Sequence, residues 1–253
     1  MIKQELKVLF TAIMFYSRIP VPKIEYPDEL LNKATRYFPF VGIIVGAIGA
    51  LTFVISHLVL STNISVLAAM ISMIMATGAF HEDAISDFCD GFGGGYTKEK
   101  ILDIMKDSRI GTYGAVAIVM LLLSKFFLLS EIDTAKMPII LISAHALSRL
   151  STIVMIYSSN YVRFDNNSKA KPIGQKHSFS TIVIASIFGL TPLCFLPTIY
   201  IPFILVILLI LFVYFRYYVH KIIGGYTGDV LGTLQQLSEI GFYLVYIVCS
   251  KML

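Results

Sequence analysis

The sequence predicts an all-α integral membrane protein with about seven transmembrane helices and one N-terminal interfacial helix. Three observations lead to this fold class. Only 14% of the 253 residues are charged, whereas a soluble domain has roughly 25%. The mean hydropathy is high, at +0.79. The apolar residues also occur in runs close to the ~20 residues that span a bilayer.

The first predicted element is an amphipathic helix over residues 3–16, in which Lys3, Glu5 and Lys7 interrupt an apolar run. A helix of this kind is expected to lie in the membrane interface and not to cross it. The early charges, with no small-residue cleavage site after them, argue against a secretory signal peptide.

Seven apolar runs follow, and each is predicted to be a membrane-spanning helix. They cover residues 37–60, 63–80, 110–131, 136–158, 180–199, 201–219 and 233–250. The fifth and sixth are the least regular, because Pro192, Pro197 and Pro202 can kink them or form a tight turn. Since no linker, repeat or long polar segment interrupts the chain, residues 1–253 are predicted to form a single integral membrane domain.

The placement of Lys and Arg predicts how these helices are oriented. Sixteen of the 20 cationic residues lie in segments 1–36, 98–109, 163–176 and 216–221. Seven spans put all four segments on one side of the membrane, and the positive-inside rule makes that side the cytoplasm. We therefore expect a multi-pass protein of the cell membrane.

The densest polar cluster, FHEDAISDFCDGFGGGYTKEK at residues 80–100, lies on the predicted cytoplasmic side. Asp83, Asp87 and Asp90 are four and three residues apart, so in a helix they share one face. Carboxylates so arranged repel unless a cation offsets them, and oxygen ligands without a cysteine pair favour Mg²⁺ over zinc. Gly94, in the glycine run that follows, is expected to let the backbone approach an anionic ligand. The alternative is a solvated acidic helix end with a flexible loop.

A second cluster on the same side is KDSRIGTYG, residues 106–114. Asp107 could add a carboxylate, and Lys106 and Arg109 are candidate phosphate ligands because Arg binds phosphate in bidentate fashion. For the two cations alone, a positively charged flank with a helix cap is the simpler interpretation.

A third cluster is GGYTGD, residues 224–229, in which Gly225, Thr227 and Asp229 are the candidates. A turn before a helix would explain this string equally well. The shared location of the three clusters makes a functional site more probable than any one cluster does, because separate segments bring acids, glycines and cations to one predicted face.

Two cations, Lys125 and Arg149, fall inside predicted spans, where a charged side chain is costly and is usually paired or functional. Lys125 is either a structural ion-pair partner or a site residue, and Glu239 in the last span is a candidate partner for either cation. His81 could orient Asp83 or act as a base, or it could be an ordinary polar residue at a helix end. His145 is expected to form a hydrogen bond between packed helices.

Five ordered motifs carry a family resemblance: FYSRIPVP (15–22), RYFPFVGIIVGAIGA (36–50), GAFHEDAISDFCDGF (78–92), ILDIMKDSRIGTYG (101–114) and GGYTGDVLGTLQQLSEIGF (224–242). In these motifs, and over nearly its whole length, the chain resembles the cobalamin synthases, the adenosylcobinamide-GDP ribazoletransferases of vitamin B12 assembly. It departs from the family pattern at Glu82, where an aliphatic residue is usual, and at Ser86, where alanine is usual.

The resemblance implies that residues 1–253 are one catalytic domain joining adenosylcobinamide-GDP to α-ribazole, or to its 5′-phosphate. The product is adenosylcobalamin, or its 5′-phosphate, and GMP is released. The 5′-hydroxyl of α-ribazole is expected to attack the cobinamide-linked phosphate. Mg²⁺ is the implied cofactor, and its expected ligands are Asp83, Asp87, Asp90, Asp107 and Asp229.

The remaining roles are assigned on the same basis. The expected catalytic residues are His81, Asp87 and Asp90. The expected substrate-binding residues are Lys106, Arg109, Lys125, Arg149, Gly94, Gly225 and Thr227. The expected partners are the small-molecule substrates and membrane lipids, with a second copy of the chain or late cobalamin-pathway enzymes as further candidates. No nucleic-acid partner is expected.

Two other classes of protein compete with this interpretation. A CDP-alcohol phosphatidyltransferase has a signature that opens with D-x-x-D-G, as do Asp87, Asp90 and Gly91, but the signature then requires Ala-Arg where Gly94 and Gly95 stand. An ion-coupled transporter would place its charged residues near the bilayer midplane and often has inverted repeats. Here the carboxylates gather toward one face and no repeat is evident.

Overall fold

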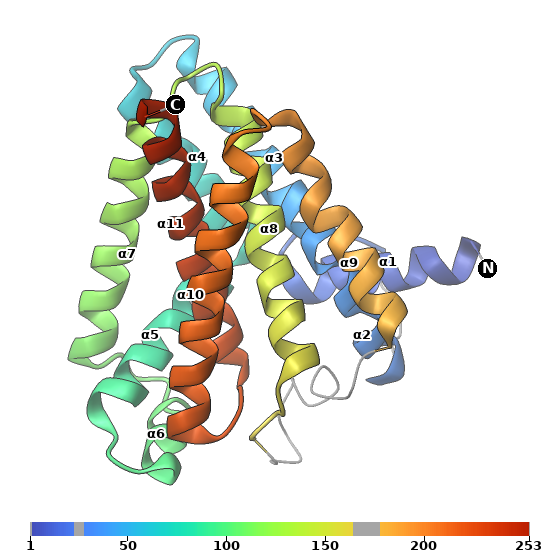
Figure 1. The fold of residues 1–253 in the computed structure, drawn as a ribbon, viewed down its shortest axis with the longest axis vertical. Coiled ribbons are helices and arrows are strands. Elements are labelled where there is room, and N and C mark those ends of the chain that lie inside the picture. Colours follow the sequence, from blue (N-terminus) through green and yellow to red (C-terminus); the bar gives the residue numbers. More distant parts are fainter. Residues whose placement is uncertain (1, 23–27, 164–177, 253) are drawn as a thin grey trace.

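A computed structural model of the chain describes residues 2–22, 28–163 and 178–252. Within these ranges every regular element is a helix, apart from one isolated β-bridge between Tyr161 and Tyr226. The helices are α1 (Ile2–Tyr16), α2 (Asp28–Ala34), η1 (Thr35–Tyr37), α3 (Phe38–His57), α4 (Thr62–Thr77), α5 (Phe80–Gly94), α6 (Lys98–Ile104), α7 (Thr112–Ser130), α8 (Met137–Ser158), α9 (Phe179–Leu190), η2 (Thr191–Phe195), α10 (Tyr200–Ile223) and α11 (Gly228–Met252) (Figure 1). The predicted all-α class is confirmed.

Each predicted span has a helix in its place, but a count of seven spans is not confirmed. In the described residues, four stretches are long and apolar enough to cross a membrane: Glu29–His57, α7, α8 and α10. Helices α4 and α5 pass that test only as a pair, bent by 85°, which would raise the count to five. Helix α9 with η2 is shorter, and α11 carries Gln235, Gln236 and Glu239, which lower its hydropathy.

Helices α8 and α11 form the centre of the bundle, and α10 and α7 lie at its surface. In α8, 78% of the apolar window is buried, compared with 11% in α10 and 22% in α7. Helix α11 packs against α5, α7, α8 and α10, and α8 packs against α3, α9 and α11. Polar side chains on α8 and α11 therefore face protein, while α10 presents exposed apolar side chains suited to contact with lipid.

Helices α3 and α8 approach closely because α3 carries glycines four residues apart. A side chain at Gly42 would meet the backbone of His145, and one at Gly46 would meet the backbone of Ile142. Small residues at this spacing allow helices in a membrane to pack backbone against backbone. The motif RYFPFVGIIVGAIGA is thus explained as a helix-packing surface.

The corner between α4 and α5 is made by two consecutive left-handed residues, Gly78 with φ of 70° and Ala79 with φ of 58°. A left-handed backbone is unusual for alanine, so the surrounding structure must hold it. Arg18 contributes, because its backbone N–H donates to the Ala76 carbonyl oxygen at 2.7 Å and its side chain covers Gly78. The corner turns α5 across the bundle instead of continuing the line of α4 (Figure 1).

Helix α1 lies across the bundle axis and is tied to the start of α3, in keeping with the predicted interfacial helix (Figure 1). Glu5 forms an ion pair with Arg36 at 2.8 Å and accepts a hydrogen bond from the Tyr37 hydroxyl at 2.9 Å. Val8 and Ala12, on the inner face of α1, are buried.

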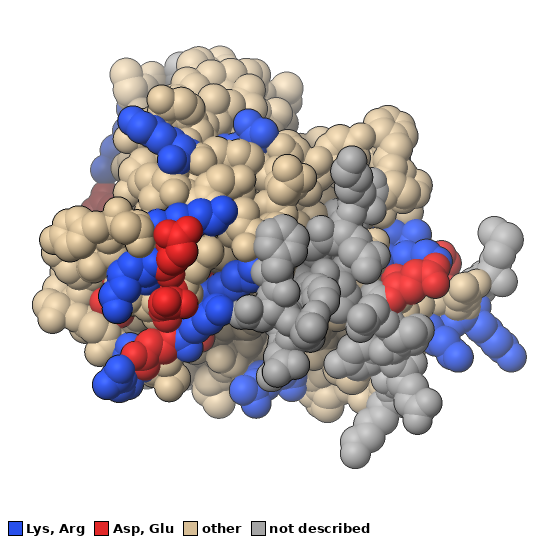
Figure 2. Space-filling view, turned by 90° about the horizontal axis from the view of Figure 1, so that it is seen from below, with Lys and Arg blue, Asp and Glu red and all other residues tan. Residues whose placement is uncertain are grey.

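The loops fall at two ends of the bundle. Connections 58–61, 131–136 and 196–199 lie at the upper end with the C-terminus, and connections 95–97, 105–111 and 224–227 lie at the lower end (Figure 1). Acidic and basic side chains are interspersed on the lower end (Figure 2). This agrees with the predicted grouping of charge, although Lys23, Lys169, Lys171 and Lys176 lie outside the described residues.

Candidate active site

The predicted carboxylates of α5 lie on one side of the helix and meet Asp229 of α11. Asp83 is exposed, Asp87 is partly exposed and Asp90 is buried. The carboxyl of Asp87 interacts electrostatically with those of Asp229, Asp83 and Asp90. The structure thus brings together four of the five predicted metal ligands, from segments far apart in the sequence. We call Asp83, Asp87, Asp90 and Asp229 the acidic cluster.

Within this cluster, Asp90 has a structural task that the spacing of the aspartates did not indicate. Its carboxylate accepts hydrogen bonds from the backbone N–H of Gly111 at 2.7 Å and of Gly114 at 2.9 Å, at the start of α7. A Cβ atom at Gly111 or Gly114 would collide with the Asp90 carboxylate. The glycines of KDSRIGTYG therefore form a cradle for Asp90, which satisfies unpaired N–H groups of α7 and complements its dipole.

The fourth carboxylate, Asp229, stands in the first turn of α11 and forms an ion pair with Arg163 at 2.9 Å. Burial raises the pKa of the Asp229 carboxyl, Arg163 partly offsets this effect, and the nearby Asp83 raises it further. A carboxylate held among others in this way is stabilised by a nearby cation. Arg163 was counted among the charges of the predicted cytoplasmic side, but the sequence did not identify it as a site residue.

Asp107 and Arg109 pair with each other in the loop between α6 and α7. The Arg109 guanidinium donates to Asp107 at 2.6 Å, and these hydrogen bonds lower the pKa of Asp107 to about 2. Both side chains are on the surface, with that of Arg109 88% exposed. Lys106, in the same loop, and Gly94, at the end of α5, are also exposed. These residues thus line the lower surface near the end of α5.

Gly225 and Thr227 serve the local fold around the start of α11. A side chain at Gly225 would collide with the Asn160 carbonyl oxygen, because the two segments run together there. Tyr226 pairs through its backbone with Asn160 at 2.9 Å and with Val162 at 3.0 Å. The fully buried Thr227 accepts a hydrogen bond from Val230 N–H at 3.3 Å, as a helix cap does. For Gly225 and Thr227, these contacts match the alternative offered from the sequence, a turn before a helix.

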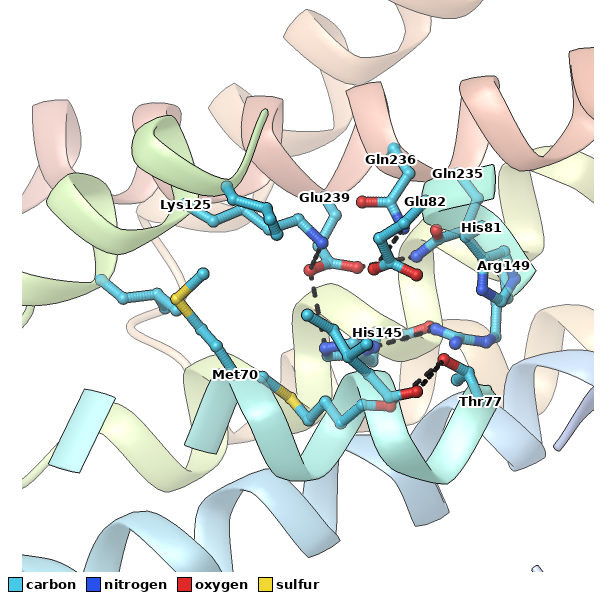
Figure 3. Close-up of a pocket in the computed structure, with 14 residues that line it drawn as sticks. Met70, Thr77, His81, Glu82, Lys125, His145, Arg149, Gln235, Gln236 and Glu239 are labelled. Atoms are coloured by element: carbon cyan, nitrogen blue, oxygen red, sulfur yellow. Dashed lines mark hydrogen bonds and ion pairs between the residues drawn. The ribbon is translucent and has the colours of Figure 1, made fainter. Parts of the chain in front are cut away.

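Lys125 and Arg149 do not join the acidic cluster but line a polar cavity between α4, α5, α7, α8 and α11 (Figure 3). Lys125 forms a buried ion pair with Glu239 at 2.7 Å. Glu239 also accepts hydrogen bonds from Gln235 at 2.7 Å and from Tyr243 at 3.3 Å. The suggested partnership of Lys125 and Glu239 is confirmed, and it supports the structural role of the lysine.

Arg149 and the two histidines extend the same network. Arg149 is 1% exposed; it donates to the His145 carbonyl oxygen at 3.0 Å, and its guanidinium lies 5.4 Å from the centre of the Phe38 ring. His145 is also 3.5 Å from Glu239. His81 lines the cavity, and its electrostatic neighbours are Arg149, Glu239, Lys125 and His145, not Asp83.

Glu82, one of the two positions that depart from the family pattern, belongs to this cavity. It is buried, and its carboxylate accepts a hydrogen bond from Gln236 at 3.3 Å. Gln235 and Gln236 were missed as site residues. The signal that could have found them is a pair of amides inside an apolar run, with Gln235 one helical turn before Glu239.

The acidic cluster suits Mg²⁺ by its donor chemistry, since carboxylate oxygens are the ligands that this ion takes. In the described residues no group of three His, Cys, Asp or Glu side chains is close enough to enclose a metal by itself. Mg²⁺ in phosphate-handling sites usually takes one or two carboxylates and completes its shell with water and substrate phosphate. The open arrangement of Asp83, Asp87 and Asp229 is compatible with that mode.

The fold and the site together define a class of protein: a helical, membrane-type bundle with converging carboxylates at one end and a buried charged cavity beside them. Comparison with known proteins narrows this class to one family. A family model described as cobalamin-5-phosphate synthase matches residues 8–247. The chain belongs to the cobalamin-5-phosphate synthase family.

Individual relatives agree with this assignment. An adenosylcobinamide-GDP ribazoletransferase of Vibrio cholerae is 41% identical over 247 residues, which cover 96% of this chain and 94% of the relative. Proteins of the same description from Shewanella frigidimarina and Vibrio parahaemolyticus are 41% and 40% identical, over 96% and 97% of this chain and 94% of each relative. No solved structure matches the chain.

Proposed function

We propose that this protein joins adenosylcobinamide-GDP to α-ribazole, or to its 5′-phosphate, and releases GMP. The observation that carries the proposal is the match to transferases of that description along almost the whole chain, at 41% identity. The matched residues include both segments that form the acidic cluster. The products are adenosylcobalamin, or adenosylcobalamin 5′-phosphate, and GMP.

The attacking group in this proposal differs from the one expected from the sequence. The family description names a product that keeps a phosphate at position 5. A ribose whose 5′ oxygen already carries phosphate must attack through a secondary hydroxyl. We therefore replace the 5′-hydroxyl with a secondary ribose hydroxyl, which serves α-ribazole and its 5′-phosphate equally.

The bond changes are those of a phosphate-group transfer. The ribose oxygen forms a bond to the phosphorus next to cobinamide, and the bond from that phosphorus to the bridging oxygen of the diphosphate breaks. GMP leaves with the bridging oxygen. The hydroxyl proton passes to a carboxylate of the acidic cluster, which is closer to the exposed lower surface than the buried His81 is.

Asp83, Asp87 and Asp229 would hold Mg²⁺, and the ion would supply neutralisation of phosphate charge. Arg163 stands beside Asp229 and is placed to bind the diphosphate, because a guanidinium pairs well with phosphate oxygens. Phosphate transfer depends mainly on such positioning and charge stabilisation. Asp90 supports the site by fixing α7 against α5. We place the cluster on the cytoplasmic side of the cell membrane.

The proposal is tested with protein purified into nanodiscs and supplied with adenosylcobinamide-GDP, α-ribazole and Mg²⁺. Mass spectrometry should detect GMP and adenosylcobalamin in equal amounts. Asp87→Asn should abolish both products, and Asp103→Asn, an exposed carboxylate of α6 outside the cluster, should not. A folded, magnesium-replete sample that forms no product from α-ribazole or from its 5′-phosphate would overturn the proposal, and CDP-alcohol substrates would then be tried.

A further inference from the structure

A second pocket, distinct from the polar cavity, opens between α1, α3, α5, the end of α8 and the start of α11. It contains about 520 Å³ of space between atoms, counting the part that is open to solvent. Its walls are largely aromatic, and the rings come from five separate stretches of the sequence: Phe15, Tyr16, Phe38, His81, Tyr161 and Tyr226. We call it the aromatic pocket.

The rings of the aromatic pocket are arranged as stacked and edge-on pairs. Tyr16 stacks on Phe38, with ring centres 4.1 Å apart. Phe38 is nearly parallel to His81, with an angle of 14° between the planes and 5.9 Å between the centres. Tyr161 meets Tyr226 edge-on at 5.6 Å. Such walls favour a flat aromatic ligand, which can continue stacked and edge-to-face contacts.

Two polar atoms of the pocket's lining residues lack a hydrogen-bond partner in the described part of the chain: the Tyr226 hydroxyl and His81 Nε2. Tyr226 is 1% exposed and His81 is 2% exposed. Because His81 also lines the polar cavity, only the Tyr226 hydroxyl is particular to the aromatic pocket. Buried polar groups are nearly always paired, so this unpaired hydroxyl points to a ligand that supplies a polar atom. An acyl chain of a lipid would leave this hydroxyl unpaired, whereas a ring nitrogen can accept its hydrogen bond.

The aromatic pocket is lined by the first turns of the two helices that carry the acidic cluster. On α11, Gly228 lines the pocket and Asp229 is the next residue. On α5, His81 lines the pocket and Asp83 lies two residues further along. A ligand whose ring occupies the pocket can therefore place an attached sugar near the carboxylates.

We propose that the aromatic pocket binds the benzimidazole ring of α-ribazole. The two fused rings lie among Tyr16, Tyr161 and Tyr226, since Tyr16 and Arg149 already cover Phe38. The unsubstituted ring nitrogen accepts a hydrogen bond from the Tyr226 hydroxyl. The ribose then reaches the acidic cluster, where its hydroxyl meets the phosphate. This inference rests on the proposed function and adds the subsite that selects the nucleophile's base.

The first test removes only the hydroxyl, by Tyr226→Phe, in the nanodisc turnover assay. We expect KM for α-ribazole to rise roughly five- to tenfold, because a buried hydrogen bond to the ligand is lost. KM for adenosylcobinamide-GDP and kcat should change little. The matched control is Tyr157→Phe, whose ring is 50% exposed on α8. Equal KM values for α-ribazole in both variants would overturn the proposal.

The second test measures binding without turnover. The chain contains no tryptophan, so Phe15→Trp introduces a single tryptophan fluorophore in the pocket wall. Adding α-ribazole should shift its emission, but not that of Phe127→Trp on the surface of α7. If wild-type turnover is intact and the pocket fluorophore does not respond, the subsite is wrong and the proposed function stands. If wild-type protein forms no product, the proposed function itself has failed.

Discussion

Among the predicted site residues, Asp90 shows the largest difference between its predicted role and its observed contacts. The spacing of the aspartates predicted a metal ligand, and the structure places its carboxylate on two backbone N–H groups that begin α7. The two partners are 21 and 24 residues away in the sequence. An aspartate in this position fixes one helix to another and so positions the carboxylates beside it.

Asp90→Ala should lower the free energy of unfolding by about 2 kcal/mol, because two N–H groups lose a charged acceptor. Asp90→Asn should lower it less, since the amide oxygen can still accept one of the hydrogen bonds. Thermal unfolding in detergent, followed by circular dichroism, measures both. Asp103→Ala, on the exposed surface of α6, serves as the control. Equal melting temperatures for Asp90→Ala and Asp103→Ala would contradict the capping role.

The Lys125–Glu239 pair gives a second prediction at the residue scale. Lys125→Met leaves the Glu239 carboxylate buried without its cation and should cost about 3–5 kcal/mol of stability. Adding Glu239→Gln to that variant should restore a large part of the loss, because no buried charge then remains unpaired. Equilibrium unfolding of the two single variants and the double variant completes the cycle. Additive losses would show that the two side chains do not stabilise one another.

At the scale of helices, packing of α3 against α8 depends on the absence of side chains at Gly42 and Gly46. We expect Gly46→Ala to destabilise the protein by about 1–3 kcal/mol, because the backbone of α8 must shift. Gly94→Ala is the matched control for folding, since a methyl group there meets only ordinary contact with Ile104 at 3.6 Å. Thermal unfolding should separate the two variants. A Gly46→Ala protein as stable as Gly94→Ala would refute close packing at this site.

The helices were predictable because each apolar run is long enough to define an element, and the ranges of α3, α7 and α8 agree closely with the prediction. A count of seven spans is not confirmed, because α11 carries Gln235, Gln236 and Glu239, which are buried against other helices and lower its hydropathy. The 85° corner at Gly78 and Ala79 was also missed. A left-handed alanine is held by tertiary contacts, which a local pattern does not contain.

The same limit applies to the site. The acidic cluster was predictable from helical spacing and from shared sidedness, and the partner of Lys125 from the cost of a buried charge. The pairing of Arg163 with Asp229 was not predictable, and neither was the aromatic pocket. In both cases the residues that meet are far apart in the sequence. Contacts between distant segments become visible only when the helices are packed.

For the whole molecule, we propose that the lower end of the bundle faces the cytoplasm. In a Cys194→Ser background, Ser108→Cys marks the lower end and Ser61→Cys the upper end, and both positions are exposed. A membrane-impermeant maleimide added to intact cells should label Ser61→Cys at once and Ser108→Cys only after the membrane is opened. Labelling of Ser108→Cys in intact cells would reverse the orientation.

We propose that carboxylates of α5 and α11 act together in a magnesium-dependent transfer. Its most direct test is the rate of GMP release as a function of Mg²⁺ concentration, for the wild type, Asp83→Asn, Asp229→Asn and the Asp103→Asn control. The account predicts no activity with EDTA and a Mg²⁺ requirement at least about tenfold higher in both cluster variants than in the control, since each loses a ligand charge. Turnover that persists in EDTA, or an unchanged Mg²⁺ requirement in both cluster variants, would contradict it.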